Sequence, residues 1–202
     1  DESVSQASYT EESAPWSSLD ISNVVIEPGV THIGENAFKN CSVQKITIPN
    51  SVKTIGNSAF SDCSSLETVC YMGSESEWNL ISIGSNNDKL LNAKKYYNNG
   101  KCGDNVSWSY DSTTNTLTIS GTGAMNNYEY NNEAPWYGYC ENILTVKIES
   151  GVTKIGESAF NGCSSLTNVI IPNTVKYIRF SAFSSCVSLT EIDLPDSVMS
   201  LH

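Results

Sequence analysis

The 202-residue chain has little positive charge and no long hydrophobic run. It carries 11 Lys and Arg against 22 Asp and Glu, a net charge of −11. No apolar stretch approaches the roughly 18 residues that span a bilayer. A nucleic-acid surface needs clustered Lys and Arg to neutralise phosphate, and an anionic bilayer would repel so acidic a chain. We therefore expect neither nucleic-acid binding nor membrane insertion, and we interpret the acidity as a solubility feature.

Residues and motifs that carry catalysis or bind metals are also scarce. The two histidines, His32 and His202, have no acid or serine placed with them by a recognisable motif, and the seven cysteines lack metal-ligand spacing. Asp104, Asn105 and Asp111 could offer oxygen ligands to calcium, but turn polarity explains them better. We expect no enzymatic activity, no cofactor and no metal.

A recurring pattern dominates what is present: V-x-x-I-G-x-x-A-F-x-x-C-x-x-L-x-x-V-x-I-P. Copies begin at Val30, Val52, Val152 and Val175, so neighbouring copies are 22 or 23 residues apart. Arg179 replaces the glycine in the last copy. A fixed period of this length is typical of a solenoid, in which each unit packs only on its neighbours.

The L-x-x-V-x-I part of each repeat alternates apolar and polar residues, which predicts a strand. Equal spacing places these strands side by side in one parallel sheet, and the proline after most of them ends the strand. The G-x-x-A-F-x-x-C part should return over the opposite face as a short helix or 3-10 turn, its glycine needing positive φ or a close backbone approach. The six predicted strands contain Ile21/Val24/Ile26, Val43/Ile46/Ile48, Leu66/Val69/Tyr71, Ile143/Val146/Ile148, Leu166/Val169/Ile171 and Leu189/Ile192/Leu194.

The cysteines leave several pairings open. Cys41, Cys63, Cys163 and Cys186 hold the same place in the repeat, so they are first interpreted as small buried apolar side chains. Neighbouring coils lie within disulfide reach, which also allows the pairs Cys41–Cys63 and Cys163–Cys186. The two cysteines in the middle region, Cys102 and Cys140, form a third possible bridge.

A larger duplication underlies the repeats. Ala14-Pro15-Trp16 recurs as Ala134-Pro135-Trp136, about 120 residues later. Between the two blocks, Ser74-x-x-Glu77 predicts a capping box, Asn87-Asp88 a second short helix with Leu90, Leu91 and Ala93 inward, and 94–97 a strand. The alternating runs 106–110 and 116–120 predict a β-hairpin.

These features suggest four segments along the chain. We expect one continuous solenoid with elongated middle coils; two short solenoids around an independent β module are the alternative. The segments are 1–13, the remnant of a truncated preceding unit; 14–72, the first repeat block; 73–133, degenerate coils and hairpin; and 134–202, the second repeat block.

The form V-x-x-I-G-x-x-A-F-x-x-C-S-S-L-x-x-V-x-I-P resembles the BspA-like (Treponema-type) leucine-rich repeats of bacterial surface proteins. The match covers 16–72 and 134–198. This resemblance implies an α/β solenoid, a right-handed leucine-rich-repeat coil with a parallel β-sheet on one face and short helical turns on the other. It also implies an extracellular or cell-surface location and adhesion to a host or microbial protein.

Candidate contacts are the polar slots of the strands, which should point outward from the sheet. A second candidate patch is the aromatic cluster Trp136–Tyr139 with Tyr128 and Tyr130. We expect a monomer that binds a protein partner, a host-matrix or another bacterial surface protein; a structural spacer that projects another domain is the alternative. The outward residues are Asn23, Val25, Lys45, Thr47, Thr68, Cys70, Thr145, Lys147, Asn168, Ile170, Glu191 and Asp193.

Overall fold

The computed structural model describes Ala14, residues 20–128 and residues 134–201. The chain forms two compact units, residues 1–97 and residues 98–202.

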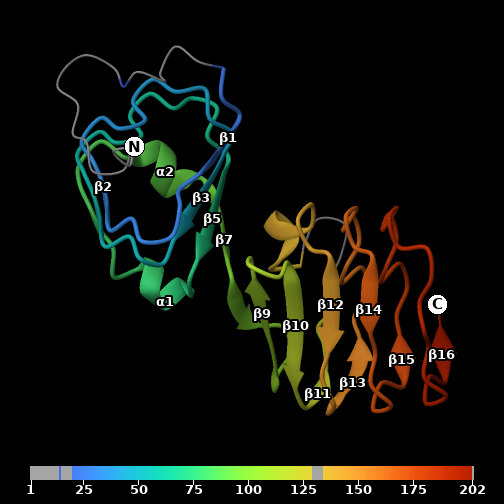
Figure 1. Ribbon diagram of the computed structural model, residues 1–202. Coiled ribbons are helices and arrows are strands. Elements are labelled where there is room, and N and C mark those ends of the chain that lie inside the picture. The colour runs from blue at the N-terminus through green and yellow to red at the C-terminus, as the bar shows by residue number, and fades with distance from the viewer. Residues whose placement is uncertain (1–13, 15–19, 129–133, 202) are drawn as a thin grey trace. The chain divides into compact units, whose positions relative to one another are not determined.

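Two parallel sheets build the first unit. The larger has the strand order β1-β3-β5-β7 and the smaller β2-β4-β6, so successive coils lie side by side as the period predicts (Figure 1). The larger sheet consists of β1 (Asn23–Val25), β3 (Lys45–Pro49), β5 (Thr68–Met72) and β7 (Lys94–Tyr97), and the smaller of β2 (His32–Ile33), β4 (Thr54–Ile55) and β6 (Ser82–Ile83).

Two short helices close the third coil of this unit. Helix α1 (Glu75–Trp78) begins with the predicted capping box, in which the Ser74 hydroxyl accepts from the Glu77 N–H and the Glu77 carboxylate accepts from the Ser74 N–H. Helix α2 (Asp88–Asn92) buries Leu90, but Leu91 is 48% exposed, so the prediction that Leu91 lies inward is wrong. In a helix, successive side chains are about 100° apart, so Leu91 points in a different direction from the buried Leu90.

The side chain of Asn87, at the start of α2, forms hydrogen bonds with backbone groups that elsewhere bond to the backbone of the next coil. Its side chain is buried: Oδ1 accepts from the Phe60 N–H at 3.0 Å, and Nδ2 donates to the carbonyls of Gly56 and Gly84, both at 2.9 Å. One amide side chain thus satisfies two backbone groups of the preceding coil and one of its own coil, at the place where the Ala-Phe turn is missing.

The second unit contains the predicted hairpin inside its main sheet. Strands β9 and β10 pair antiparallel, and β10, β12 and β14 pair parallel, giving the order β14-β12-β10-β9-β8. A second sheet has the order β11-β13-β15-β16, all parallel. The strands are β8 (Asn99–Lys101), β9 (Val106–Asp111), β10 (Thr116–Gly121), β11 (Gly123–Ala124), β12 (Thr145–Ile148), β13 (Val152–Ile155), β14 (Asn168–Ile170), β15 (Tyr177–Ile178) and β16 (Ser200–Leu201).

The Ala-Phe segments are runs of turns rather than helices. The residue before each Ala is left-handed, with φ of 57° at Asn36, 55° at Ser58, 52° at Ser158 and 55° at Ser181. A left-handed residue interrupts a right-handed helix, and Asn, Ser and Asp reach this region more readily than branched residues. The described part of the second unit has one 3-10 helix, η1 (Tyr137–Tyr139).

The repeat glycine is required by close packing between coils rather than by positive φ. A Cβ on Gly56 would lie 2.6 Å from the Glu35 nitrogen, and one on Gly156 would lie 1.7 Å from the Asn126 carbonyl oxygen. Neither residue has positive φ. Of the two requirements considered for this position, the close approach is confirmed.

Stacked side chains fill the core of each unit. Phe38 stacks on Phe60 at 5.1 Å in the first unit. In the second, the fully buried Trp136 stacks on Phe160 at 5.5 Å, and Phe160 stacks on Phe183 at 5.2 Å. Because these successive coils each supply a ring at the same repeat position, the rings form a short aromatic column in each unit.

The structure confirms the first interpretation of the repeat cysteines, as small buried side chains, for Cys41, Cys63 and Cys186. The disulfide joins Cys140 to Cys163, and the other five cysteines, Cys41, Cys63, Cys70, Cys102 and Cys186, are buried and not disulfide-bonded. All three pairings considered from the sequence are therefore wrong. Cys63 and Cys186 instead donate from Sγ to the Phe carbonyl of the preceding coil, at 2.8 and 3.1 Å. Those hydrogen bonds satisfy thiols that the repeat spacing alone would allow to pair.

The last predicted strand is also corrected. Residues 189–194 form no strand, although the five other predicted segments coincide with β1, β3, β5, β12 and β14. Segment 189–194 would have only one neighbour, β14, which weakens the ladder there. The boundary between units falls at 97/98, inside the segment 73–133. The continuous solenoid and the four segment boundaries stay a prediction.

Candidate protein-binding surface

In the first unit, the outward residues of the large sheet form two registered rows. One row runs Asn23, Lys45, Thr68 and Lys94, and the other runs Val25, Thr47, Cys70 and Tyr96. Val25 is 65% exposed, whereas Cys70 and Tyr96 are buried at 1% and 7%. Cys70 is therefore inaccessible, although the strand alternation predicts that it points away from the core. Burial raises the pKa of its thiol to about 11, although nearby Lys45 lowers it somewhat.

In the second unit, the outward face of the main sheet is rich in hydroxyl groups. Thr145 registers with Asn168 and Lys147 with Ile170, as the repeat predicts. The hairpin extends both rows, because Thr116 and Thr118 register with Thr145 and Lys147. Beyond them, the β9 residues Asp111 and Ser109 register with Thr116 and Thr118. Residues directly opposite each other share one face of a sheet, so two rows of four side chains cross β9, β10, β12 and β14.

We name the eight side chains of these two rows the hydroxyl face. Its edge positions on β9 and β14 are exposed, and Ile170 is 48% exposed. The Lys147 ammonium lies 3.3 Å from the Glu149 carboxylate, an exposed pair that contributes little stability. The hydroxyl face consists of Ser109, Asp111, Thr116, Thr118, Thr145, Lys147, Asn168 and Ile170.

The sequence identified the four repeat-derived residues of the hydroxyl face but missed the four on the hairpin. The alternation in 106–110 and 116–120 predicts two strands, but it does not predict where in the sheet they insert. Aligning the hairpin strand with the repeat strands could have found them, since the outward residues Thr116 and Thr118 are two positions apart, as are Thr145 and Lys147. Glu191 and Asp193 are exposed, but they lie in 189–194, outside the sheet ladder.

The proposed aromatic patch is mostly core. Trp136, Tyr139 and Tyr128 are buried at 0%, 3% and 6%, whereas Tyr137 is 44% exposed. Trp136 donates from Nε1 to the Ala159 carbonyl at 2.8 Å, which fixes the indole inside the coil. Tyr130 lies outside the described residues. The prediction of an aromatic contact patch is wrong for the buried members.

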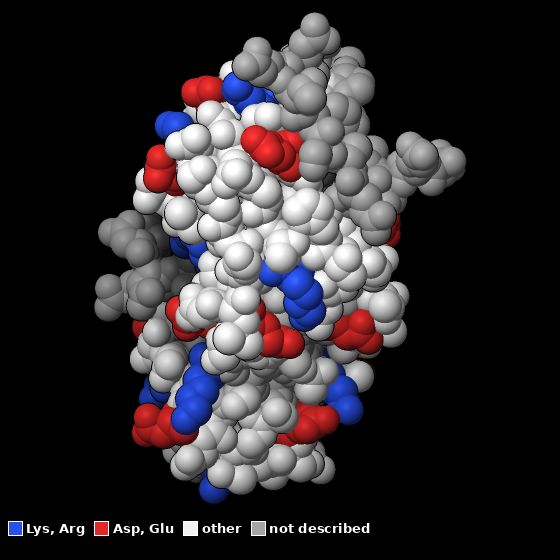
Figure 2. Space-filling view, turned by 90° about the vertical axis from the view of Figure 1, so that its left-hand side faces the viewer, with Lys and Arg blue, Asp and Glu red and all other residues white. Residues whose placement is uncertain are grey.

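Charges of both signs are interspersed on the molecular surface visible in Figure 2, and neither sign forms a continuous patch there. Among residues 20–128 and 134–201, no three His, Cys, Asp or Glu side chains gather as metal ligands would. No helix in the described part of the chain is long and apolar enough to cross a bilayer.

The model of the BspA-type leucine-rich repeat region matches residues 11–88 and 133–202 in six copies. The chain belongs to this family. The BspA-type repeat accounts for the coil period and for the Ala-Phe column described above. No curated protein that was searched matches this member.

Solved bacterial structures resemble this BspA-type chain over part of their length. A leucine-rich repeat protein from Eubacterium ventriosum is 36% identical over 43% of this chain and 23% of that one, with a TM-score of 0.41. A leucine-rich cell surface protein from Faecalibacterium prausnitzii is 20% identical over 88% and 48%, with a TM-score of 0.37. The pneumococcal vaccine antigen PcpA is 20% identical over 83% and 49%, with a TM-score of 0.36. The chain thus spans less than half the length of each.

Proposed function

We propose that this chain is a non-enzymatic binding module of a bacterial cell-surface or secreted protein, and that it adheres to a host or microbial protein through the hydroxyl face. The observation that carries the proposal is the register of that face, in which two rows of outward side chains cross four hydrogen-bonded strands. The family membership supports the bacterial-surface setting.

The composition of the face favours a polar partner surface. Short Ser and Thr side chains lose little rotamer entropy on binding and can both donate and accept hydrogen bonds. Lys147 adds one cation and Ile170 one exposed apolar side chain, so the face offers three kinds of contact within two adjacent strands. No Trp, Tyr or Arg lies on it, which argues for moderate affinity spread over many contacts.

The test is a binding screen of the 202-residue chain against extracellular-matrix proteins, followed by two charge-matched variants. Lys147→Glu reverses the charge on the hydroxyl face, and Lys176→Glu makes the same reversal on an exposed lysine just before β15 in the other sheet. We expect Lys147→Glu to weaken binding about tenfold and Lys176→Glu to leave it unchanged. Equal effects of the two variants would remove the hydroxyl face from consideration, and no binding to any partner would favour a spacer.

A further inference from the structure

Arg179 occupies a repeat position that glycine holds in the other copies. At that position, a Cβ on Gly56 would lie 2.6 Å from the Glu35 nitrogen of the preceding coil. The Arg179 N–H donates to the Ile155 carbonyl of its preceding coil at 3.2 Å, whereas the Gly56 and Gly84 N–H groups make the equivalent bond at 2.8 Å. The arginine is therefore accommodated with a longer hydrogen bond between coils. Natural proteins keep such local departures mainly at functional sites.

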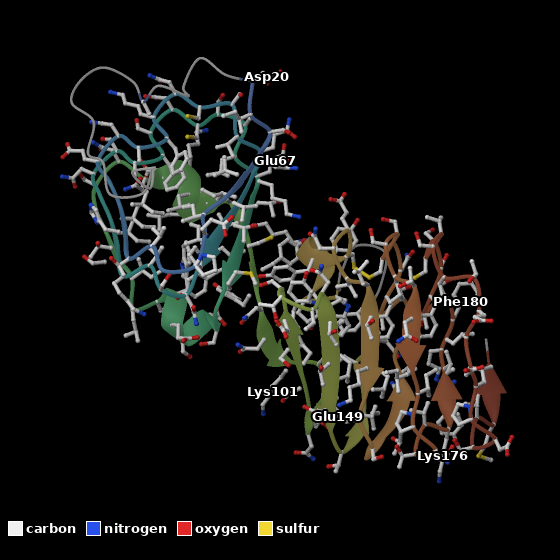
Figure 3. The ribbon with its side chains drawn as sticks, viewed as in Figure 1. Asp20, Glu67, Lys101, Glu149, Lys176 and Phe180 are labelled. Atoms are coloured by element: carbon white, nitrogen blue, oxygen red, sulfur yellow. A yellow bond between two sulfur atoms is a disulfide. The ribbon has the colours of Figure 1, made fainter. Side chains whose placement is uncertain are left out.

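A second cation lies on the adjacent strand. Lys154 of β13 registers with Tyr177 of β15, and the Arg179 guanidinium lies over the Tyr177 ring, with Cζ 5.4 Å from the ring centroid. Tyr177 is paired with β16 on its other side, so these side chains lie between hydrogen-bonded strands. Figure 3 labels Lys176 and Phe180, the residues that flank the stretch from Tyr177 to Arg179.

The two cations repel each other without a carboxylate between them. Burial lowers the pKa of the Lys154 ammonium, and the nearby Arg179 guanidinium lowers it further. In the part of the chain that the structure describes, neither side chain forms an ion pair with Asp or Glu. The chain carries 22 acidic against 11 basic side chains, so carboxylates are plentiful and yet none neutralises this pair. A bound anion would remove the repulsion.

The side chain of Asn127 adds a further hydrogen-bond donor beside Lys154. Its Oδ1 accepts from the Lys154 Nζ and from the Glu157 N–H, both at 3.2 Å. Because its oxygen is held by these two donors, the remaining polar group of the Asn127 amide is the donor Nδ2. The ammonium has two further N–H groups and the guanidinium five, so three neighbouring side chains supply donors to one place.

We propose that Arg179, Lys154 and Asn127 form a binding site for a single phosphate group, either free or carried as a monoester by an otherwise uncharged molecule. A phosphate group has a charge of about −1.5 to −2 at pH 7 and three strong acceptor oxygens, which match two cations and their N–H donors. The planar guanidinium bonds two of these oxygens at once, and the ammonium acts as a compact point charge.

The net charge of the chain limits what carries the phosphate group. At −11, the chain repels polyanions over a longer range than a two-cation site attracts them, so the ligand should bear no other negative charge. The site lies on the sheet β11-β13-β15-β16, whereas the hydroxyl face lies on β9, β10, β12 and β14. Phosphate binding is therefore independent of the proposed adhesion.

The test is an NMR titration of the isotopically labelled 202-residue protein with sodium phosphate at constant pH and ionic strength. We expect saturable shifts of the Tyr177 and Arg179 amide signals, with a Kd of about 1–10 mM, and a rise in the pKa of the Lys154 ammonium when phosphate is bound. A parallel titration with glycerol 1-phosphate distinguishes the sources. Binding as tight as that of inorganic phosphate identifies a monoester as a ligand, and binding about tenfold weaker identifies the free ion.

Three variants locate the site. Arg179→Gly restores the residue of the other repeat copies, so it should fold, and it should weaken phosphate binding about tenfold, as should Lys154→Gln. Lys147→Gln removes one positive charge from the hydroxyl face instead and should leave phosphate binding unchanged. No saturable shift up to about 20 mM phosphate, or equal weakening by all three variants, overturns the proposal. Tighter binding of a heparin oligosaccharide than of phosphate overturns it as well, because that result would show attraction of a polyanion.

Discussion

The two units differ in whether cysteines of neighbouring coils form a disulfide. In the first, Cys41 and Cys63 both follow an Ala-Phe turn, and both remain free thiols. In the second, Cys140 lies 23 residues before Cys163 and is bonded to it. Cys140 follows η1 rather than an Ala-Phe turn, with Trp136 in place of the usual Phe. In the duplicated first block, the residue four places after the tryptophan is Asp20, where the second has Cys140.

The difference shows that a repeat period brings cysteines near each other without deciding whether they pair. Where both coils have an Ala-Phe turn, the thiol of the later coil donates a hydrogen bond to the Phe carbonyl of the earlier coil. Cys63 donates in this way to Phe38, and Cys186 to Phe160. The disulfide forms where one of the two cysteines, Cys140, follows the 3-10 helix η1 instead of an Ala-Phe turn. The local backbone before the cysteine, rather than the coil spacing, separates the two outcomes.

The largest loss of stability is expected from a substitution that disrupts the stacked aromatic rings of the second unit only. Trp136→Ala removes a fully buried indole that stacks on Phe160 and donates to the Ala159 carbonyl. We expect a loss of about 3–5 kcal/mol in the free energy of unfolding of this unit. Hydrogen exchange resolved by residue should show faster opening at Val146 and no change at Ile46 in the first unit. Equal acceleration at both residues would contradict the independence of the two columns.

Removing the bridge should have the next largest effect. Cys140→Ser opens a covalent loop of 23 residues, which lowers the unfolding free energy of the second unit by about 3 kcal/mol. Chemical denaturation of the oxidised protein and the variant measures the difference. Cys41→Ser is the matched control. Because that thiol is not in a disulfide, the effect of the substitution on the unfolding free energy should be the same under oxidising and reducing conditions. If the oxidised and reduced wild-type proteins unfold at the same denaturant concentration, the bridge does not contribute.

A smaller effect should be common to both units. Ser58 and Ser158 hold the left-handed position before Ala, with φ of 55° and 52°. Replacing either with Val should cost about 1–2 kcal/mol, because a branched side chain collides with its own backbone there. Gly at the same positions should be tolerated. Thermal unfolding of the four variants checks the expectation, and a Val variant as stable as its Gly counterpart would count against it.

The smallest effect concerns alkaline pH. Burial raises the pKa of the Cys63 thiol to about 12 from an ordinary value of 9.0. Because the folded-state pKa is the higher one, the stabilisation is present below pH 9 and is lost as pH rises from 9 toward 12. Between pH 8 and pH 10 we expect a modest fall in the stability of the first unit, about 1 kcal/mol or less. Chemical denaturation of the wild-type protein and the Cys63→Ala variant at both pH values measures the change in unfolding free energy. If the unfolding free energy of the variant falls with pH as steeply as that of the wild type, Cys63 is excluded as the source.

Most of the fold followed from local periodicity. Alternation predicted five of the six repeat strands and the hairpin strands β9 and β10, because each strand has one buried and one outward side. The strand β7 was also predicted, as the run that follows the second short helix. The capping box at Ser74 was predicted because its two hydrogen bonds involve residues only three apart. The surface was predicted less well. Cys70 is in an outward slot and yet buried, and the hairpin half of the hydroxyl face depends on a strand order that no local pattern contains.

The sequence by itself determined the coil period, the inward Val, Ile, Leu and Phe columns, and the family, because a short period forces equivalent residues into equivalent places. Only the tertiary structure decided what depends on contacts between coils. It shows that the repeat glycine avoids a collision at Asn126, that Asn87 replaces a backbone acceptor, and that Cys163 bonds to Cys140. The physical reason is that propensity and alternation act within one coil, whereas hydrogen-bond partners, sulfur pairing and register are properties of two coils packed together.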